Sequence, residues 1–184
     1  MKELSLNILD IAENSVKAKA KRIGISLVEE ADSTMLLTIE DDGCGMDADT
    51  LARVCDPFFT TRTTRPVGMG ISLLKLAAEQ TGGWLTIDSV SEKDNAVNHG
   101  TVLKALFHRE HLDCVPIGDV VSTLITLIQG SPDIDFVFLH HTPAGEVSMN
   151  TAELRQVLGD VPLSSFEVLQ WITEYLNEQY SCIM

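Results

Sequence analysis

The sequence predicts a fold of the α+β class, in which strands joined by hairpins accompany amphipathic helices. In several stretches apolar residues recur every three or four positions, as they do on the buried face of a helix. Between them lie short runs rich in β-favouring residues, and polar turns join these runs in pairs, which is typical of antiparallel strands. The chain has 184 residues, of which 45% are hydrophobic, enough for one domain or for a domain with an appendage.

The first part of the chain is expected to contain three helices and four strands. A helix over residues 4–18 has an apolar face and a polar stripe, with Asn7, Asp10 and Asn14 at three- and four-residue spacing. Asparagine is unfavourable inside a helix, so two on one stripe indicate a role beyond solvation. The other expected elements are strands over 23–28 and 35–39, a short helix capped by Asp47 or Asp49 and ending at 54, a helix over 71–81, and strands over 84–89 and 101–107.

The composition changes around residues 116–118, so the sequence divides into residues 1–112 and an extension over residues 113–184 of expected order α-β-β-α-α. Its expected elements are a helix over 119–129, a hairpin of 134–141 with 146–149, and helices that begin at the capping-box pairs Asn150 with Glu153 and Ser164 with Glu167. Its aromatic residues predicted to lie in the core are Phe136, Phe138, Phe166, Trp171 and Tyr175.

The charge of the chain excludes two classes of partner. The formal net charge is −14, so the phosphates of nucleic acids and the surface of an anionic membrane would repel the protein. The charge is uneven, because residues 113–184 contain ten acidic residues and a single basic one, Arg155. This acidic extension is expected to contact a protein partner.

The cysteines and the N-terminus predict a cytoplasmic protein. The four cysteines show neither paired spacing nor histidines at metal-ligand spacing, which favours free thiols in a reducing cytosol. The N-terminal residues lack the features of a signal peptide, and no apolar run approaches the roughly 18 residues that span a membrane.

An acidic turn with two glycines follows the strand expected over 35–39. Asp41 precedes Gly43 and Gly45, and glycines after a strand let a ligand approach the backbone because they lack a Cβ. A carboxylate repels phosphate but accepts hydrogen bonds, which suits the exocyclic amine of adenine. The alternative interpretation is an Asp-Gly surface turn.

A second glycine pair, Gly68 and Gly70, opens the helix expected over 71–81. A glycine loop at a helix start presents free N–H groups and the positive end of the helix dipole, which together form an anion site. The preceding loop, residues 62–67, is basic and rich in threonine, so it can close over phosphates as a lid.

The order of these motifs resembles the GHKL superfamily of ATP-binding domains, which includes gyrase, the ninety-kilodalton heat-shock chaperones, histidine kinases and MutL-type repair proteins. The motifs are Asn14 on the first helix, Asp-x-Gly-x-Gly after a strand, Pro-Phe-Phe-Thr-Thr before a basic loop, Gly-x-Gly into a helix, and Gly100-Thr101 opening a strand. The resemblance covers about residues 4–108. It implies a two-layer α/β sandwich with a mostly antiparallel sheet and helices on one face, which binds ATP or ADP with Mg²⁺.

The resemblance also assigns roles to individual residues. Asn14 matches the amide that ligates Mg²⁺, an ion that prefers oxygen ligands. Asp41 matches the carboxylate that accepts the adenine amine, which Thr101 assists through water. The residues matching the approach and packing of the base are Gly43, Gly45 and Met46. Those matching the lid and the phosphate contacts are Phe58, Thr60, Thr61, Arg62, Arg65, Gly68, Met69 and Gly70. The family's longer glycine run is shortened here, with Pro66 at the place of the first glycine.

The resemblance leaves three functions open. The lid segment is most similar to that of histidine kinases, but only thirteen residues precede Asn14, so a phosphoacceptor helix pair is not expected and transfer would go to another chain. Asp10 lies one helical turn before Asn14, where hydrolytic members and serine kinases carry a general base; the alternative is an ion pair with Lys17 or Arg22. We expect a stand-alone protein kinase acting in trans on a Ser or His. The alternatives are an ATPase that drives a conformational switch and a non-catalytic ATP sensor.

Two further expectations concern assembly and repair. The chain is expected to be able to form a homodimer. The stretch over residues 13–20 is similar to the MutL form of the motif, but the acidic extension and the missing second domain argue against a DNA-repair role.

Overall fold

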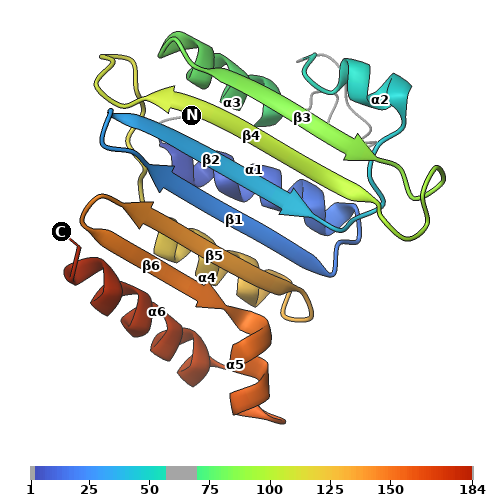
Figure 1. Cartoon of the computed structure of the whole chain (residues 1–184). Coiled ribbons are helices and arrows are strands. Elements are labelled where there is room, and N and C mark those ends of the chain that lie inside the picture. Colours follow the sequence, from blue (N-terminus) through green and yellow to red (C-terminus); the bar gives the residue numbers. More distant parts are fainter. Residues whose placement is uncertain (1–2, 57–69, 184) are drawn as a thin grey trace.

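A computed structural model describes residues 3–56 and 70–183, which form one sheet with helices on one of its faces (Figure 1). In chain order the elements are α1 (Leu4–Lys17), β1 (Arg22–Glu29), β2 (Thr34–Asp41), α2 (Ala48–Arg53), α3 (Gly70–Gln80), β3 (Trp84–Val90), β4 (Gly100–His108), α4 (Val120–Gly130), β5 (Asp135–Thr142), β6 (Gly145–Asn150), α5 (Thr151–Leu158) and α6 (Phe166–Ser181).

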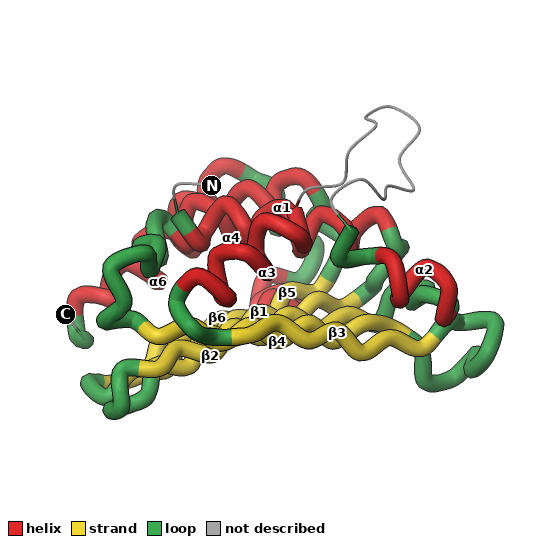
Figure 2. Tube along the Cα trace, turned by 90° about the horizontal axis from the view of Figure 1, so that it is seen from above, coloured by secondary structure: helices red, strands yellow, loops and turns green. Residues whose placement is uncertain are grey.

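The sheet has six strands in the order β3-β4-β2-β1-β5-β6. Four of its five neighbouring pairs are antiparallel, and β1 with β5 is the parallel pair. Seen along the sheet, α1, α2, α3, α4 and α6 lie on the same side of it (Figure 2). The expected α+β class, with a mostly antiparallel sheet and helices on one face, is therefore confirmed.

The C-terminal extension has the expected order α-β-β-α-α, and its strands continue the sheet of the preceding residues. Asp135 to His141 of β5 pair in register with Arg22 to Val28 of β1. Helix α4 packs against both α1 and α6. The buried apolar side chains of both parts form one contiguous core. The boundary at residue 112 stays a sequence-based prediction, and the two parts share one sheet and one core.

The core follows from the alternation of side chains along the central strands. Ile25 and Leu27 of β1 lie opposite Ile39 and Leu37 of β2, and all four side chains are buried. Because successive residues of a strand point to opposite faces, this alternation directs one face of the sheet toward the helices. On α1 the apolar face that the spacing predicted supplies Leu4, Ile8 and Ile11, which are also buried.

The prediction for the aromatic residues of the extension is right for β5 and wrong for α6. Phe136 and Phe138 are each 1% exposed, because they alternate toward the helices. Phe166, Trp171 and Tyr175 are 75%, 49% and 37% exposed. The buried face of α6 is instead formed by Val168, Leu169, Ile172 and Leu176. The rings of Trp171 and Tyr175 stack on each other with centroids 5.1 Å apart, which shields part of their surface.

Aspartates cap two helices, and the sequence indicated the first of these caps. The Asp47 side chain accepts a hydrogen bond from the Thr50 N–H at the start of α2. At the start of α4, Asp119 accepts from both the N–H and the hydroxyl of Ser122, at 2.8 and 2.6 Å. The cap expected at Ser164 differs by one residue, since Ser165 precedes α6, and its side chain makes no capping hydrogen bond.

Replacing Asp119 with alanine is expected to lower the free energy of unfolding by about 1 kcal/mol, because the first turn of α4 loses its cap. The hydrogen bonds from the side chain and then the backbone of Ser122 lower the pKa of Asp119 below its usual value. A lowered folded-state pKa means that the stabilisation is present above the unfolded-state pKa and is lost as the pH falls through the folded-state pKa. Urea titrations at pH 7 and pH 3 check this, since the difference between wild type and Asp119→Ala should shrink at pH 3.

Within the described ranges, no helix has both the length and the apolar character needed to cross a membrane.

Candidate nucleotide site

Asp41 ends β2, and two donors fix its carboxylate. The hydroxyl of Ser15 on α1 donates to Oδ2 at 2.6 Å, and the N–H of Gly43 donates to Oδ1 at 2.9 Å. Each carboxylate oxygen can accept more than one hydrogen bond, so both keep capacity for a further donor. The carboxylate is therefore oriented and still able to accept an amine. Sequence reasoning missed Ser15, although it directly follows Asn14.

The acidic turn is anchored to the end of α1. The N–H of Cys44 donates to the carbonyl of Ala18 at 2.9 Å. A Cβ on Gly43 would come within 2.8 Å of the Ala18 Cβ. His99 Nδ1 lies 2.6 Å from the carbonyl oxygen of Gly43, and because a carbonyl only accepts, this nitrogen carries the proton. Gly43 thus lets the turn pack against the end of α1, in addition to the approach of the base that the sequence predicted.

Gly45 is required by the close approach of the backbone of Val90, the last residue of β3. Its φ is +64°, and a Cβ there would lie 1.9 Å from the carbonyl oxygen of Val90. The N–H of Glu92 donates to the carbonyl of Cys44, which holds the same two segments together. The sequence suggested that Gly45 leaves room for a base, and the structure shows that the positive φ and the contact with Val90 also require a glycine here.

A hydroxyl pair links Met46 and Thr101 to the turn. Thr101 lies opposite Asp41 in the register of β4 with β2. Ser89 Oγ contacts the N–H of Met46 at 2.9 Å, the carbonyl of Gly100 at 2.9 Å and Thr101 Oγ1 at 3.0 Å. The Ser89 hydroxyl has one proton, which it donates in a hydrogen bond to the Gly100 carbonyl. The Thr101 hydroxyl therefore donates to Ser89 and keeps its lone pairs for another donor. Ser89 is a second residue that sequence reasoning missed, because only the pairing of β3 with β4 brings it here.

Asp10 and Asn14 lie on α1, and Asp10 lies beside the start of α3. A Cβ built on Gly70 would lie 3.3 Å from the Asp10 Cβ and 3.6 Å from its Oδ2. Lys17 pairs with Glu13 at 2.9 Å, and among the described residues Asp10 forms no ion pair. The third residue of the predicted polar stripe, Asn7, is buried and only 2% exposed. The amide oxygen of Asn14 is the kind of donor that Mg²⁺ prefers, so this side chain fits the ion, and Asp10 places a carboxylate one turn away.

The structure thus places Gly70 of α3 beside Asp10, one turn before Asn14 on α1. It gathers the other described site residues around the acidic turn: Asp41, Gly43, Gly45, Met46 and Thr101. Ser15 connects the two groups, because it follows Asn14 on α1 and contacts Asp41. The remaining predicted site residues, which lie outside the described residues, are Phe58, Thr60, Thr61, Arg62, Arg65, Gly68 and Met69.

Comparison with known proteins identifies the family. The model of the family described as histidine kinase-, DNA gyrase B- and HSP90-like ATPase matches residues 2–111. The chain belongs to this family. It therefore carries an ATP-binding domain of the histidine-kinase-like type, and the resemblance seen in the sequence is confirmed.

Curated relatives of this ATPase-family chain are sensor proteins. A putative sensor protein of Shewanella frigidimarina is 31% identical over 103 residues, which are 54% of this chain and 15% of that protein. The signal transduction histidine-protein kinase AtoS of Escherichia coli is 38% identical over 73 residues, which are 40% of this chain and 12% of that protein. The chain therefore spans only 12–15% of the length of these two relatives.

Among solved structures, the MutL ATPase domain of Aquifex aeolicus in complex with ADP matches with a TM-score of 0.55 and 13% identity. The match covers 97% of this chain and 70% of that one. At this identity the likeness concerns the fold alone. Because it covers nearly the whole chain, it includes the C-terminal extension.

Proposed function

We propose that this domain is a protein kinase that transfers the γ-phosphate of Mg-ATP in trans to a Ser or His of a partner protein. The position of Asp10 carries the proposal. It lies beside Gly70 at the start of α3, where helix N–H groups favour an anion, and one turn before Asn14. A carboxylate at this place can accept the proton of an attacking hydroxyl or orient an imidazole while ADP leaves.

The parts of the site divide the work by chemistry. Asp41, held by Ser15 and Gly43, accepts the adenine amine and sets the position of the base. Asn14 supplies an oxygen donor for Mg²⁺, which would neutralise charge on the phosphates when bound, and Asp10 one turn away stays available as the base. The acceptor then needs only to reach the terminal phosphate, because catalysis of phosphoryl transfer rests mainly on positioning and electrostatics.

Transfer to another chain is supported by where four of the five histidines lie. His108 and His141 are at the ends of β4 and β5, and their register partners Thr34 and Val28 lie at the end of the sheet away from Asp41. His140 is 5% exposed and its two ring nitrogens contact Tyr180 and Glu29. His99 is near the acidic turn, but its Nδ1 is held by Gly43. We therefore place the phosphoacceptor on a partner, which the acidic extension would contact.

The same Asp10 could orient water, so an ATPase is the competing function. In the Asp10→Asn variant, we expect turnover of ATP to fall by roughly 10²- to 10⁴-fold, the range typical of a general base, while ADP affinity stays within about threefold. Glu13→Gln is the matched control, because Glu13 is an exposed acid on the same helix that pairs with Lys17. Wild-type turnover in Asp10→Asn would contradict the role of Asp10 as the base, and a wild type that binds ADP without measurable turnover of ATP would be an ATP sensor.

Labelled ATP separates the two enzymatic functions. The kinase proposal predicts label on a candidate partner protein, which disappears with Asp10→Asn and persists with Glu13→Gln. Release of labelled phosphate alone, at the same rate with and without each candidate partner, favours the ATPase.

A further inference from the structure

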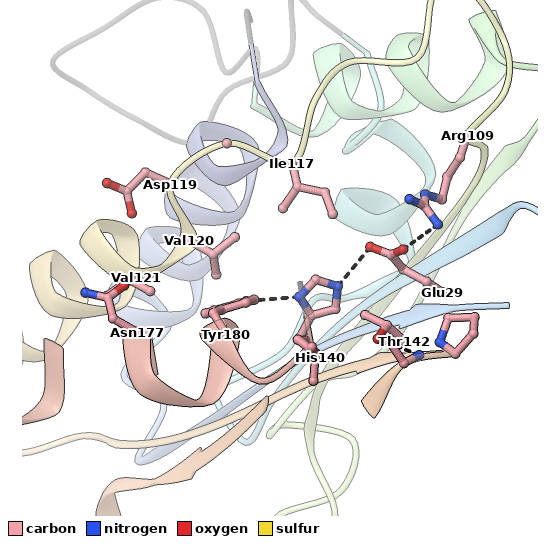
Figure 3. Close-up of a pocket in the computed structure, with 14 residues that line it drawn as sticks. Glu29, Arg109, Ile117, Asp119, Val120, Val121, His140, Thr142, Asn177 and Tyr180 are labelled. Atoms are coloured by element: carbon pink, nitrogen blue, oxygen red, sulfur yellow. Dashed lines mark hydrogen bonds and ion pairs between the residues drawn. The ribbon is translucent and has the colours of Figure 1, made fainter. Parts of the chain in front are cut away.

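A cleft with a volume of about 590 Å³ lies between the start of α4, the end of β5 and α6 (Figure 3). We call it the α4–α6 cleft. Glu29 lines it at the end of β1, and Glu29 pairs with Met35 at the end of the sheet away from Asp41. The cleft is thus separate from the nucleotide site. Its volume lies in the range of small-molecule pockets, which combine mostly apolar walls with a few placed polar groups.

A chain of four polar side chains crosses the cleft (Figure 3). Arg109 forms an ion pair with Glu29, whose Oε1 lies 3.0 Å from His140 Nε2. His140 Nδ1 lies 2.9 Å from the hydroxyl of Tyr180. The side chains of Glu29 and His140 are only 7% and 6% exposed. Buried polar groups of this kind restrict where a polar ligand group can bind.

The protons in this row of four side chains can be assigned from the donors and acceptors that each group offers. A carboxylate only accepts, so Nε2 of His140 carries a proton and donates to Glu29. Burial, followed by the charge of Glu29, raises the pKa of Tyr180 to about 12, so its hydroxyl keeps its proton, and with a neutral imidazole it donates this proton to Nδ1. The Tyr180 oxygen and the Glu29 oxygens then have lone pairs left as acceptors.

Hydrogen-bond donors remain at the Arg109 end of this row of side chains. Arg109 has five N–H donors, and its side chain is 42% exposed beside the cleft. The cleft therefore offers acceptors at Glu29 and Tyr180 next to donors at Arg109. A second acid that lines it, Asp119, has both carboxylate oxygens on Ser122.

The balance of charge selects the ligand. The cationic Arg109 and the anionic Glu29 lie side by side, so a lone anion would face Glu29 and a lone cation would face Arg109. A zwitterion complements both charges at once. The apolar lining of the cleft includes Ile117, Val120 and Ile183. They would cover an aliphatic or aromatic side chain.

We propose that the α4–α6 cleft binds an apolar α-amino acid, with its ammonium group on Glu29 and Tyr180, its carboxylate on Arg109, and its side chain against Ile117, Val120 and Ile183. This is a second ligand site, independent of the nature of the phosphoryl acceptor. A neutral amide with adjacent donor and acceptor atoms is the competing ligand.

Calorimetry on the full chain with L-leucine tests the proposal. Three probes accompany it: 4-methylpentanoate lacks the ammonium, 3-methylbutylamine lacks the carboxylate, and leucinamide carries an amide in place of the carboxylate. We expect saturable binding of an apolar amino acid, with L-phenylalanine and L-methionine tried beside leucine, and at least tenfold weaker binding of the three probes. Equal binding of any probe, or no saturable heat for any of the amino acids at millimolar concentration, overturns the proposal.

Variants assign the binding to the cleft. Arg109→Met should weaken amino-acid binding by roughly tenfold to hundredfold, because a charge-assisted hydrogen bond to the carboxylate is lost. Arg155→Met is the matched control, since Arg155 pairs with Asp135 away from the cleft. Because Arg109→Met also affects the buried Glu29, Ile117→Glu provides a second test from the apolar wall. Binding that neither cleft variant weakens would contradict the site, provided that circular dichroism shows both variants folded.

Discussion

Asp41→Asn is expected to weaken ADP binding by roughly a hundredfold. The carboxylate accepts from Ser15 and Gly43 and keeps lone pairs for the adenine amine. An amide has one acceptor oxygen and one donor NH₂, so either Ser15, Gly43 or the adenine amine then faces another donor. Losing a charge-assisted hydrogen bond costs about 1.5–3 kcal/mol, and each 1.4 kcal/mol is tenfold in affinity. Calorimetry with ADP and Mg²⁺ measures the change.

Two further variants serve as comparisons for Asp41→Asn. Asp88→Asn changes an exposed acid on β3 and should leave ADP affinity as in wild type. Ser15→Ala removes one of the two donors that orient Asp41 and should cost less than Asp41→Asn, by at most about tenfold. If Asp41→Asn bound ADP as wild type does, the nucleotide would have to be recognised elsewhere, and the site around the acidic turn would be wrong.

Local patterns predicted most of the elements to within a few residues. The apolar spacing placed the first helix over 4–18, and α1 spans Leu4–Lys17. The turn signals placed the hairpin of 134–141 with 146–149, and β5 and β6 end within one residue of those bounds. These features depend on residues close in sequence, which is why periodicity and turn chemistry reveal them.

Contacts between distant residues could not be predicted in this way. The parallel pairing of β1 with β5 joins residues more than a hundred positions apart, and no local pattern indicates it. The contact of Ser15 with Asp41, and that of Ser89 with Thr101, likewise depend on how α1 and β3 pack. The motif resemblance supplied Asp41 and Asn14 because a motif records conserved chemistry, but it does not give the side chains that hold them in place.

The exposed aromatic residues of α6 show a limit of composition. Large aromatic residues are usually buried, so Trp171 and Tyr175 were predicted to be core. The helix however buries Val168, Ile172 and Leu176, and Trp171 and Tyr175 fall at the flank of that face, where they stay partly exposed. Helical phase, read from the spacing of the aliphatic residues, would have separated the two sets.

Gly45→Ala is expected to destabilise the fold by about 3 kcal/mol or more. At a φ of +64° any side chain is strained, and the new Cβ would lie 1.9 Å from the carbonyl oxygen of Val90. The turn cannot simply move away, because Glu92 donates to Cys44 and Met46 donates to Ser89 on either side of it. Urea unfolding followed by circular dichroism measures the loss of free energy.

Gly130→Ala is the matched control for this prediction. Gly130 is the last residue of α4, and a Cβ there would meet nothing within 4 Å. Alanine should therefore leave stability unchanged or raise it by up to about 1 kcal/mol, because it lowers the entropy of the unfolded chain. If Gly45→Ala were as stable as wild type and yet failed to bind ADP, the glycine would serve the ligand and not the backbone. Loss of both stability and binding would show that the acidic turn is held in its binding conformation by the close contact with Val90.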